Sequence, residues 1–222
     1  MDYYSPFNKP IHQVEGKDLI ALKSAYEGWY LDYKREGTAP DSLAKSMSAF
    51  ANHEGGWLFI GVQEEEISNP EKGTRQKTKL RCAGSFPGVD REQREQIVSD
   101  LRTAASGAYL SPRIVFDLQT IDGPVDEIGL LNDRSILVIH VPPGVNPPHI
   151  HKNGCVYRRH VDTCEPVELR DRVELDEMWR RSMRSEDRLS QFFSRGQSFA
   201  PADARSSRVS ELYYLTDPGF SP

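Results

Sequence analysis

The feature that most constrains the fold is an amphipathic helix that runs through two glycines into a strand without alternation. Over residues 40–53 apolar residues recur at helical spacing and form one stripe: Leu43, Met47, Phe50 and Ala51. Gly55 and Gly56 end this helix with a tight turn, and residues 57–62 are then apolar throughout. Such a run predicts a strand covered on both faces, which requires packed layers on each side. An α/β protein is therefore predicted.

The rest of the chain alternates between the two element types. A short helix is predicted from Asp18, and residues 64–80 are polar and are interpreted as a long excursion that returns at residues 82–89. The further elements predicted from periodicity are strands at 29–34, 113–121, 136–141 and 155–160 and a helix at 91–106. This order favours an α/β sandwich with a mixed sheet over a purely parallel one.

Four segments are predicted from the changes in composition. Residues 1–15 form an N-terminal arm, and residues 16–170 form the main domain. Residues 171–195 belong to a highly charged helix that starts near Glu168, and residues 196–222 form a flexible tail or linker.

Composition narrows the classes of function. The net charge of -5 argues against a protein that coats nucleic acid through bulk electrostatics, although local basic patches can still bind phosphates. No apolar run approaches the length of a membrane span, and the N-terminus lacks the pattern of a signal peptide. A cytoplasmic protein without a membrane partner is expected. Three cysteines cannot all pair within the chain, so a disulfide framework is not expected.

The candidate catalytic residues are three carboxylates and a lysine: Glu27, Asp32, Glu64 and Lys34. In a strand at 29–34, alternation puts Trp29, Leu31 and Tyr33 on one face. Asp32 and Lys34 then share the opposite face. Converging carboxylates can hold a divalent cation, and a lysine can stabilise charge on a phosphate that is being cleaved. The pattern predicts that Glu27, Asp32 and Glu64 bind Mg²⁺ or Mn²⁺.

Basic residues in two segments are candidates for contacts with a nucleic-acid backbone: Lys77, Lys79, Arg81, Arg158 and Arg159. The alternative is that these residues are a solvated loop and a solvated strand edge. The residues His149, His151, Cys155, His160 and Cys164 are close together in the sequence, but their spacing matches no standard zinc motif, so zinc is disfavoured.

The segments 27–34 and 48–64 together resemble the AlbA-type Schlafen domain. That family shows Glu-Ser-x-x-x-Glu-Phe-Lys, then Ala-Phe-Ala-Asn-x-x-Gly-Gly, then an apolar strand that closes in Gly-Val-Asp-Asp. Glu27, Asp32, Lys34 and Glu64 fall on the functional positions of these motifs. The chain departs from the family pattern at Gly28, where Ser is usual, at Asp32 for Glu, at Gln63 for Asp and at Glu64 for Asp. The resemblance covers roughly residues 15–170.

The resemblance implies a Schlafen-type α/β domain and more than one class of function. Vertebrate members include endoribonucleases that cut transfer RNA with three acidic residues and a divalent metal. Many bacterial relatives are described as DNA-binding or ATP-binding regulators. Fold alone does not decide between these functions.

Three interpretations stay open. The first is a metal-dependent endoribonuclease that acts on structured RNA such as transfer RNA, in a setting such as phage defence. The second is a non-catalytic regulator that binds DNA or RNA or senses ATP. The third is an assembly module in which residues 168–195 pair with a partner or with a second copy. The first predicts that Asp32→Ala and Glu64→Ala abolish cleavage and leave the thermal melt nearly unchanged.

Overall fold

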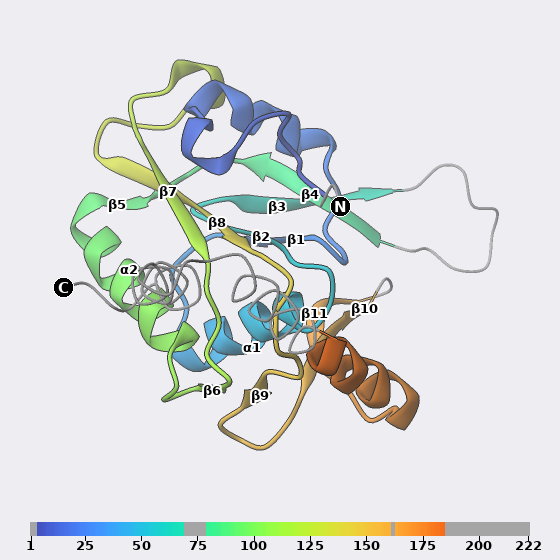
Figure 1. Cartoon of the computed structure of the whole chain (residues 1–222). Coiled ribbons are helices and arrows are strands. Elements are labelled where there is room, and N and C mark those ends of the chain that lie inside the picture. The colour runs from blue at the N-terminus through green and yellow to red at the C-terminus, as the bar shows by residue number, and fades with distance from the viewer. Residues whose placement is uncertain (1–3, 69–78, 161–162, 185–222) are drawn as a thin grey trace, which may run out of the picture.

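The computed structural model describes residues 4–68, 79–160 and 163–184, and its centre is a five-stranded mixed sheet (Figure 1). The strands are β1 (Leu31–Lys34), β2 (Gly56–Ile60), β8 (Arg134–Val141), β5 (Val89–Asp90) and β7 (Asp117–Asp122). β1 and β2 run parallel, and β8 pairs antiparallel with β2, β5 and β7. The α/β class and the mixed sheet predicted from the sequence are confirmed.

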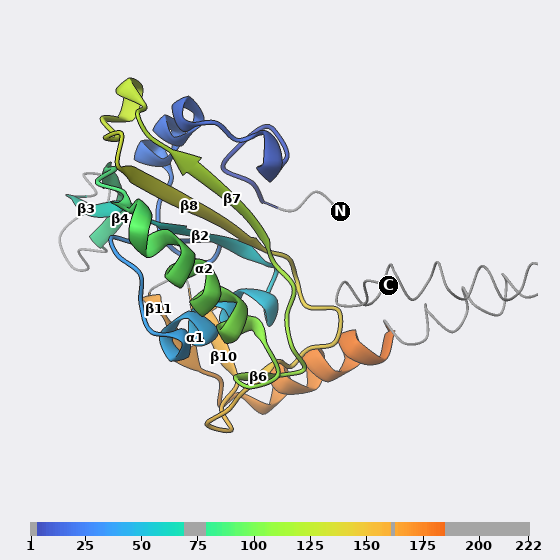
Figure 2. The ribbon, with the colours of Figure 1, turned by 90° about the vertical axis from the view of Figure 1, so that its left-hand side faces the viewer.

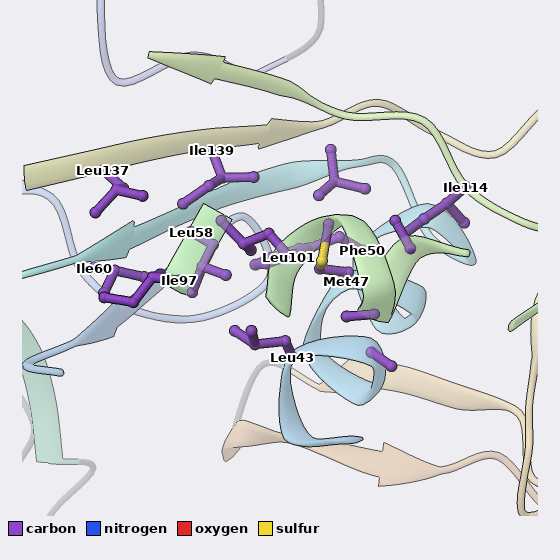
Figure 3. Close-up of a cluster of buried hydrophobic side chains, with 14 of the residues drawn as sticks. Leu43, Met47, Phe50, Leu58, Ile60, Ile97, Leu101, Ile114, Leu137 and Ile139 are labelled. Atoms are coloured by element: carbon purple, nitrogen blue, oxygen red, sulfur yellow. The ribbon is translucent and has the colours of Figure 1, made fainter. Parts of the chain in front are cut away.

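Two helices cover one face of this sheet: α1 (Pro40–Ala51) and α2 (Arg91–Ala105). Figure 3 shows their side chains meeting those of β2 and β8 in one hydrophobic cluster. Phe50 of α1, Leu58 of β2 and Leu101 of α2 are fully buried there. β2 is buried at every position, as the unbroken apolar run predicts. Pro40 begins α1, where the missing amide hydrogen of proline is not needed.

The N-terminal residues cover the opposite face, as Figures 1 and 2 show. Two 3₁₀ helices, η1 (Ile11–Gln13) and η2 (Gly16–Ser24), lie in this layer. Phe7, within the predicted arm, is buried, and its ring centroid lies 5.6 Å from that of Trp57. The buried residues of η2 are Gly16, Leu19 and Leu22. Their spacing of three matches a 3₁₀ helix, which explains why the helix predicted from Asp18 takes this form.

The polar segment after β2 is a correction to the sequence prediction. Instead of a long excursion that returns only at residue 82, it contains β3 (Gln63–Ser68) and β4 (Lys79–Ser85), which pair antiparallel. Consecutive glutamates are poor strand formers, so the pattern disfavoured a strand. Opposite charges across the pair offset this, because Arg81 lies opposite Glu66. Residues 69–78 lie outside the described part of the chain.

The remaining elements are short. β10 (Tyr157–His160) pairs antiparallel with β11 (Thr163–Glu168), a strand that the sequence did not predict. β6 (Leu110–Ser111) pairs with β9 (Ile150–His151), and η3 (Asp126–Ile128) precedes β8. The predicted strands at 113–121 and 155–160 therefore begin later than expected, at Asp117 and Tyr157.

The charged C-terminal helix is described over residues 172–184, and the rest of its predicted range and the predicted tail lie outside the described residues. The Arg181 guanidinium donates to the carbonyl oxygens of His53 at 2.9 Å and Asn52 at 3.0 Å. These carbonyls follow the last turn of α1, where a cation satisfies unpaired acceptors. Met178, three residues before Arg181 in the same helix, is buried. The helix is thus fixed to the end of α1.

A search of the described helices finds none whose length and apolar character would allow it to span a bilayer.

Candidate active site

β1 positions the first two candidate residues. Leu31 and Tyr33 point into the core on the N-terminal side of the sheet, as alternation predicts, which leaves Asp32 and Lys34 on the other face. Trp29 was expected to share the core face. It instead precedes β1 and packs against His53, with ring centroids 4.8 Å apart. β1 begins only at Leu31, so strand alternation does not extend back to position 29.

Asp32 is 4% exposed and lies between two cations. The Lys34 Nζ is 3.4 Å from its Oδ1, and the Arg159 Nη1 is 3.3 Å from its Oδ2. The contact with Arg159 is an ion pair, since neither atom has a hydrogen-bond partner of good geometry among the described residues. Two cations beside a buried carboxylate offset the cost of burying its charge and fix its position.

Glu27 precedes β1 and folds back onto it. Its Oε1 accepts a hydrogen bond from the Tyr33 amide at 2.7 Å, and its own amide donates to the Arg81 carbonyl at 2.7 Å. Burial raises the pKa of Glu27 to about 7, and the charges of Asp32 and Glu64 add to the rise. Only the Tyr33 amide lowers it. Glu27 therefore titrates near neutral pH and lies close enough to both other carboxylates to be affected by them.

Glu64 comes from β3 and completes the group. Its carboxylate accepts from the Arg81 Nη1, at 3.1 Å to Oε1 and 3.2 Å to Oε2. Arg81 Nη2 is also 3.7 Å from Glu66 Oε1. We call Glu27, Asp32, Lys34 and Glu64 the acidic cluster. The structure brings all four together from β1, from the segment before it and from β3.

The acidic cluster does not form a ready metal site. Mg²⁺ requires oxygen ligands in near-ideal octahedral positions. Among the residues with described side chains, no three His, Cys, Asp or Glu groups are arranged to hold a metal ion. Asp32 is held by Lys34 and Arg159, and Glu64 is held by Arg81. The three predicted ligands, as placed here, do not fit Mg²⁺ or Mn²⁺.

The five basic candidates have different surroundings. Arg81 contacts Glu64, and Arg158 forms an ion pair with Glu174 of helix 172–184. Lys77 lies outside the described residues, and the side chain of Lys79 is not described. Arg159 is 0% exposed, so its guanidinium is not presented to a nucleic-acid backbone. This corrects the expectation for Arg159, which followed from treating every residue of a basic pair as surface.

Sequence reasoning missed what Arg159 contacts, although one signal was present. Tyr157 and Arg159 are two residues apart in β10 and so share a strand face. Tyr157 is buried, so the face that it defines is a buried one. The alternation of this short strand indicates that Arg159 points inward and Arg158 outward.

The histidine and cysteine group considered for zinc is only partly described, because the side chains of His160 and Cys164 are not. His149 and His151 are both buried. The His149 Nδ1 lies 2.8 Å from the Pro112 carbonyl oxygen, and burial lowers the pKa of His149. Its neighbour Asn52 accepts from the His149 amide at 2.6 Å. These contacts tie the loop before β10 to the end of α1.

No curated protein matches the sequence significantly. Among solved structures, the chain is similar to the DIP2311 protein from Corynebacterium diphtheriae, with 18% identity and a TM-score of 0.36 over 68% of this chain and 24% of that one. The chain thus spans about a quarter of that protein's length.

The model of the family described as Schlafen, AlbA_2 matches residues 27–168, more than half of the chain. The match begins at Glu27, the first carboxylate of the acidic cluster, and ends with β11. The chain therefore belongs to the Schlafen AlbA_2 family, a family associated with nucleic-acid binding.

Proposed function

We propose that this chain binds RNA and cleaves its phosphodiester bonds at the acidic cluster, with structured RNA such as transfer RNA as the substrate class. The observation that supports this most is the convergence of Glu27, Asp32 and Glu64, with Lys34 beside Asp32, although Glu64 is distant from the others in the sequence. Clustered carboxylates are costly to a fold because like charges repel, so their retention favours a chemical role.

The residues supply three parts of such a reaction. Glu27, with a pKa raised to about 7, can take a proton from an attacking hydroxyl group near neutral pH. The oxygen of that hydroxyl bonds to phosphorus as the bond from phosphorus to the leaving oxygen breaks, and the leaving oxygen takes its proton from water. Lys34, held beside Asp32, can stabilise the negative charge that develops on the phosphorus oxygens. Arg81 lies at the edge of the acidic cluster and is paired with Glu64. It can hold a flanking phosphate once that phosphate replaces Glu64 as its partner.

The test is cleavage of total RNA, including transfer RNA, in the presence of Mn²⁺ or of EDTA. We expect Glu64→Gln to reduce the cleavage rate by about a hundredfold, because it removes a charge beside Glu27. Glu65→Gln is the matched control. Its side chain lies on the other face of β3 and is exposed, so cleavage should be unchanged.

A substitution of Glu64 tests the proposal better than one of Asp32, because a change at Asp32 also lowers stability. Asp32→Ala would leave the buried Arg159 without its anionic partner, so the thermal melt would fall, contrary to the expectation from sequence. Equal cleavage by the wild type and by Glu64→Gln would contradict the proposal. Retained cleavage in EDTA would show that the acidic cluster works without a metal.

A second candidate is a non-catalytic regulator that binds RNA, DNA or a nucleotide such as ATP. It is favoured by the pairing of Asp32 and Glu64 with cations and by Gln63, which stands where the family has an acid. This candidate predicts salt-dependent binding of nucleic acid without cleavage under either metal condition.

The third candidate, an assembly module, is supported by the exposed apolar residues of helix 172–184, which are Val173, Trp179 and Met183. It predicts a concentration-dependent increase in mass that Trp179→Ser would abolish, measured by light scattering.

A further inference from the structure

Arg159 is the largest fully buried side chain among the described residues. It comes from β10, far in sequence from the segment 27–34 that carries most of the acidic cluster. Burying a guanidinium is costly unless it is paired and hydrogen-bonded. Its contacts therefore show what the fold gains from placing it there.

The nitrogen atoms of the Arg159 guanidinium all contact one short segment, residues 28–32. Its Nε donates to the Gly28 carbonyl at 2.8 Å, and its Nη2 donates to the Leu31 carbonyl at 2.9 Å. Its Nη1 lies 3.3 Å from Asp32. The Gly28 amide also donates to the Leu31 carbonyl, at 3.3 Å, so these residues form a turn that closes around the guanidinium.

The other side of the guanidinium is fixed by packing. Its central carbon lies 4.7 Å from the ring centre of Phe50 in α1, a cation–π contact. Phe50 is fully buried in the helical cluster. Arg159 thus connects the rigid core to the turn 28–31, which separates Glu27 from Asp32. The planar, rigid fork of arginine suits this set of acceptors, and a lysine cannot reproduce it.

We propose that Arg159 is a positioning residue that holds the turn 28–31 so that Glu27 and Asp32 keep fixed places in the acidic cluster. The effect on RNA cleavage rests on the proposed function, whereas the positioning of the two carboxylates does not. Arg159 does not contact the substrate.

The first test is hydrogen exchange of the Tyr33 amide in Arg159→Lys. This amide donates to Glu27 Oε1, so its protection reports whether Glu27 is in place. We expect it to exchange about tenfold faster in the variant, as expected for a local opening. The Gly61 amide, which donates to the Lys34 carbonyl at 2.8 Å at the other end of β1, should be unchanged.

The second test separates positioning from phosphate binding. With Arg159→Lys, the cleavage rate should fall about tenfold while RNA affinity and its salt dependence stay the same. A phosphate contact would give the reverse, namely weaker binding with a smaller salt slope. Arg94→Lys is the matched control, because Arg94 pairs with Asp122 on the surface, and it should leave exchange, binding and cleavage unchanged.

A second pair of variants covers the case in which Arg159→Lys does not fold. Arg159→Met should melt well below the wild type, because the buried Asp32 keeps its charge and loses one of its two cations. Adding Asp32→Asn should restore part of the loss, because it removes that buried negative charge, while Lys34 keeps partial contact with solvent. The Tyr33 amide should still exchange fast in the double variant. Unchanged protection of that amide in a folded Arg159 variant would overturn the proposal. If the wild type cleaves no RNA, the proposed function fails, and the exchange result still decides the role of Arg159.

Discussion

The Glu27→Gln variant is expected to be more stable than the wild type at pH 8 and to cleave RNA about a hundredfold more slowly or not at all. The loss of cleavage follows from removing the group that takes up the proton. The gain in stability follows from the environment of Glu27, whose burial, together with the charges of Asp32 and Glu64, raises its pKa to about 7. Glutamine keeps the carbonyl that accepts from the Tyr33 amide.

The sign of the pH dependence can be derived from that pKa. In the unfolded chain Glu27 ionises near its ordinary value of 4.5, and in the folded protein near 7. Below the lower value both states are protonated, so the group costs no stability. As the pH rises between these two pKa values, Glu27 ionises in the unfolded chain while it stays largely protonated in the folded protein, so the free energy of unfolding falls. The loss is complete above the pKa of the folded protein. At pH 8 Glu27→Gln should increase the free energy of unfolding by about 1–3 kcal/mol.

The measurement is urea unfolding of both proteins at pH 4, 6 and 8. The two curves should be close at pH 4 and diverge as the pH rises. Glu65→Gln serves again as the control, because Glu65 is exposed and should show no such divergence. A constant difference between Glu27→Gln and the wild type at all three pH values would show that Glu27 has an ordinary pKa.

The part of the fold that could be predicted from sequence is the part in which side-chain period and burial agree. Phe50 and Leu58 lie on an amphipathic helix and in an unbroken apolar strand, and both are buried as expected. The strand β3 could not be predicted, because Glu64 and its two acidic neighbours disfavour a strand when read alone. Arg81, which lies opposite Glu66 and forms an ion pair with Glu64, lies beyond a segment of the chain that gave no signal of a hairpin.

The acidic cluster was partly predictable for a similar reason. Asp32 and Lys34 lie two residues apart in a strand, so their shared face followed from local geometry. The burial of Arg159 depended on Asp32 and on the carbonyls of a turn more than a hundred residues earlier. Arginine is rarely buried without partners, so a sequence that does not reveal those partners favours the surface. The same long-range pairing explains why Asp32, one of the predicted metal ligands, is paired with Arg159 instead.

A Gly56→Ala substitution should destabilise the fold strongly. A β-carbon at position 56 would lie 2.1 Å from Cδ1 and 2.3 Å from Cε1 of Phe50. Phe50 is fully buried between α1 and the sheet and has no free space into which to move. Overpacking of this kind should cost about 3 kcal/mol, which corresponds to a fall of about 10 °C in the midpoint of thermal unfolding for a chain of this length.

Gly28→Ser is the control that the chain itself offers, because a β-carbon at position 28 meets no atom within 4 Å, and serine is the usual residue of the family there. Its thermal midpoint should stay close to that of the wild type. A Phe50→Leu change added to Gly56→Ala should recover part of the loss, because the smaller side chain leaves room for the new methyl group. If Gly56→Ala unfolds at the wild-type temperature, β2 does not approach α1 as closely as described.

Phe50 also packs against the guanidinium of Arg159. Gly56→Ala should therefore make the Tyr33 amide exchange faster, because a displaced Phe50 no longer supports the arginine that holds the turn 28–31. The packing of the core would then affect the geometry of the acidic cluster.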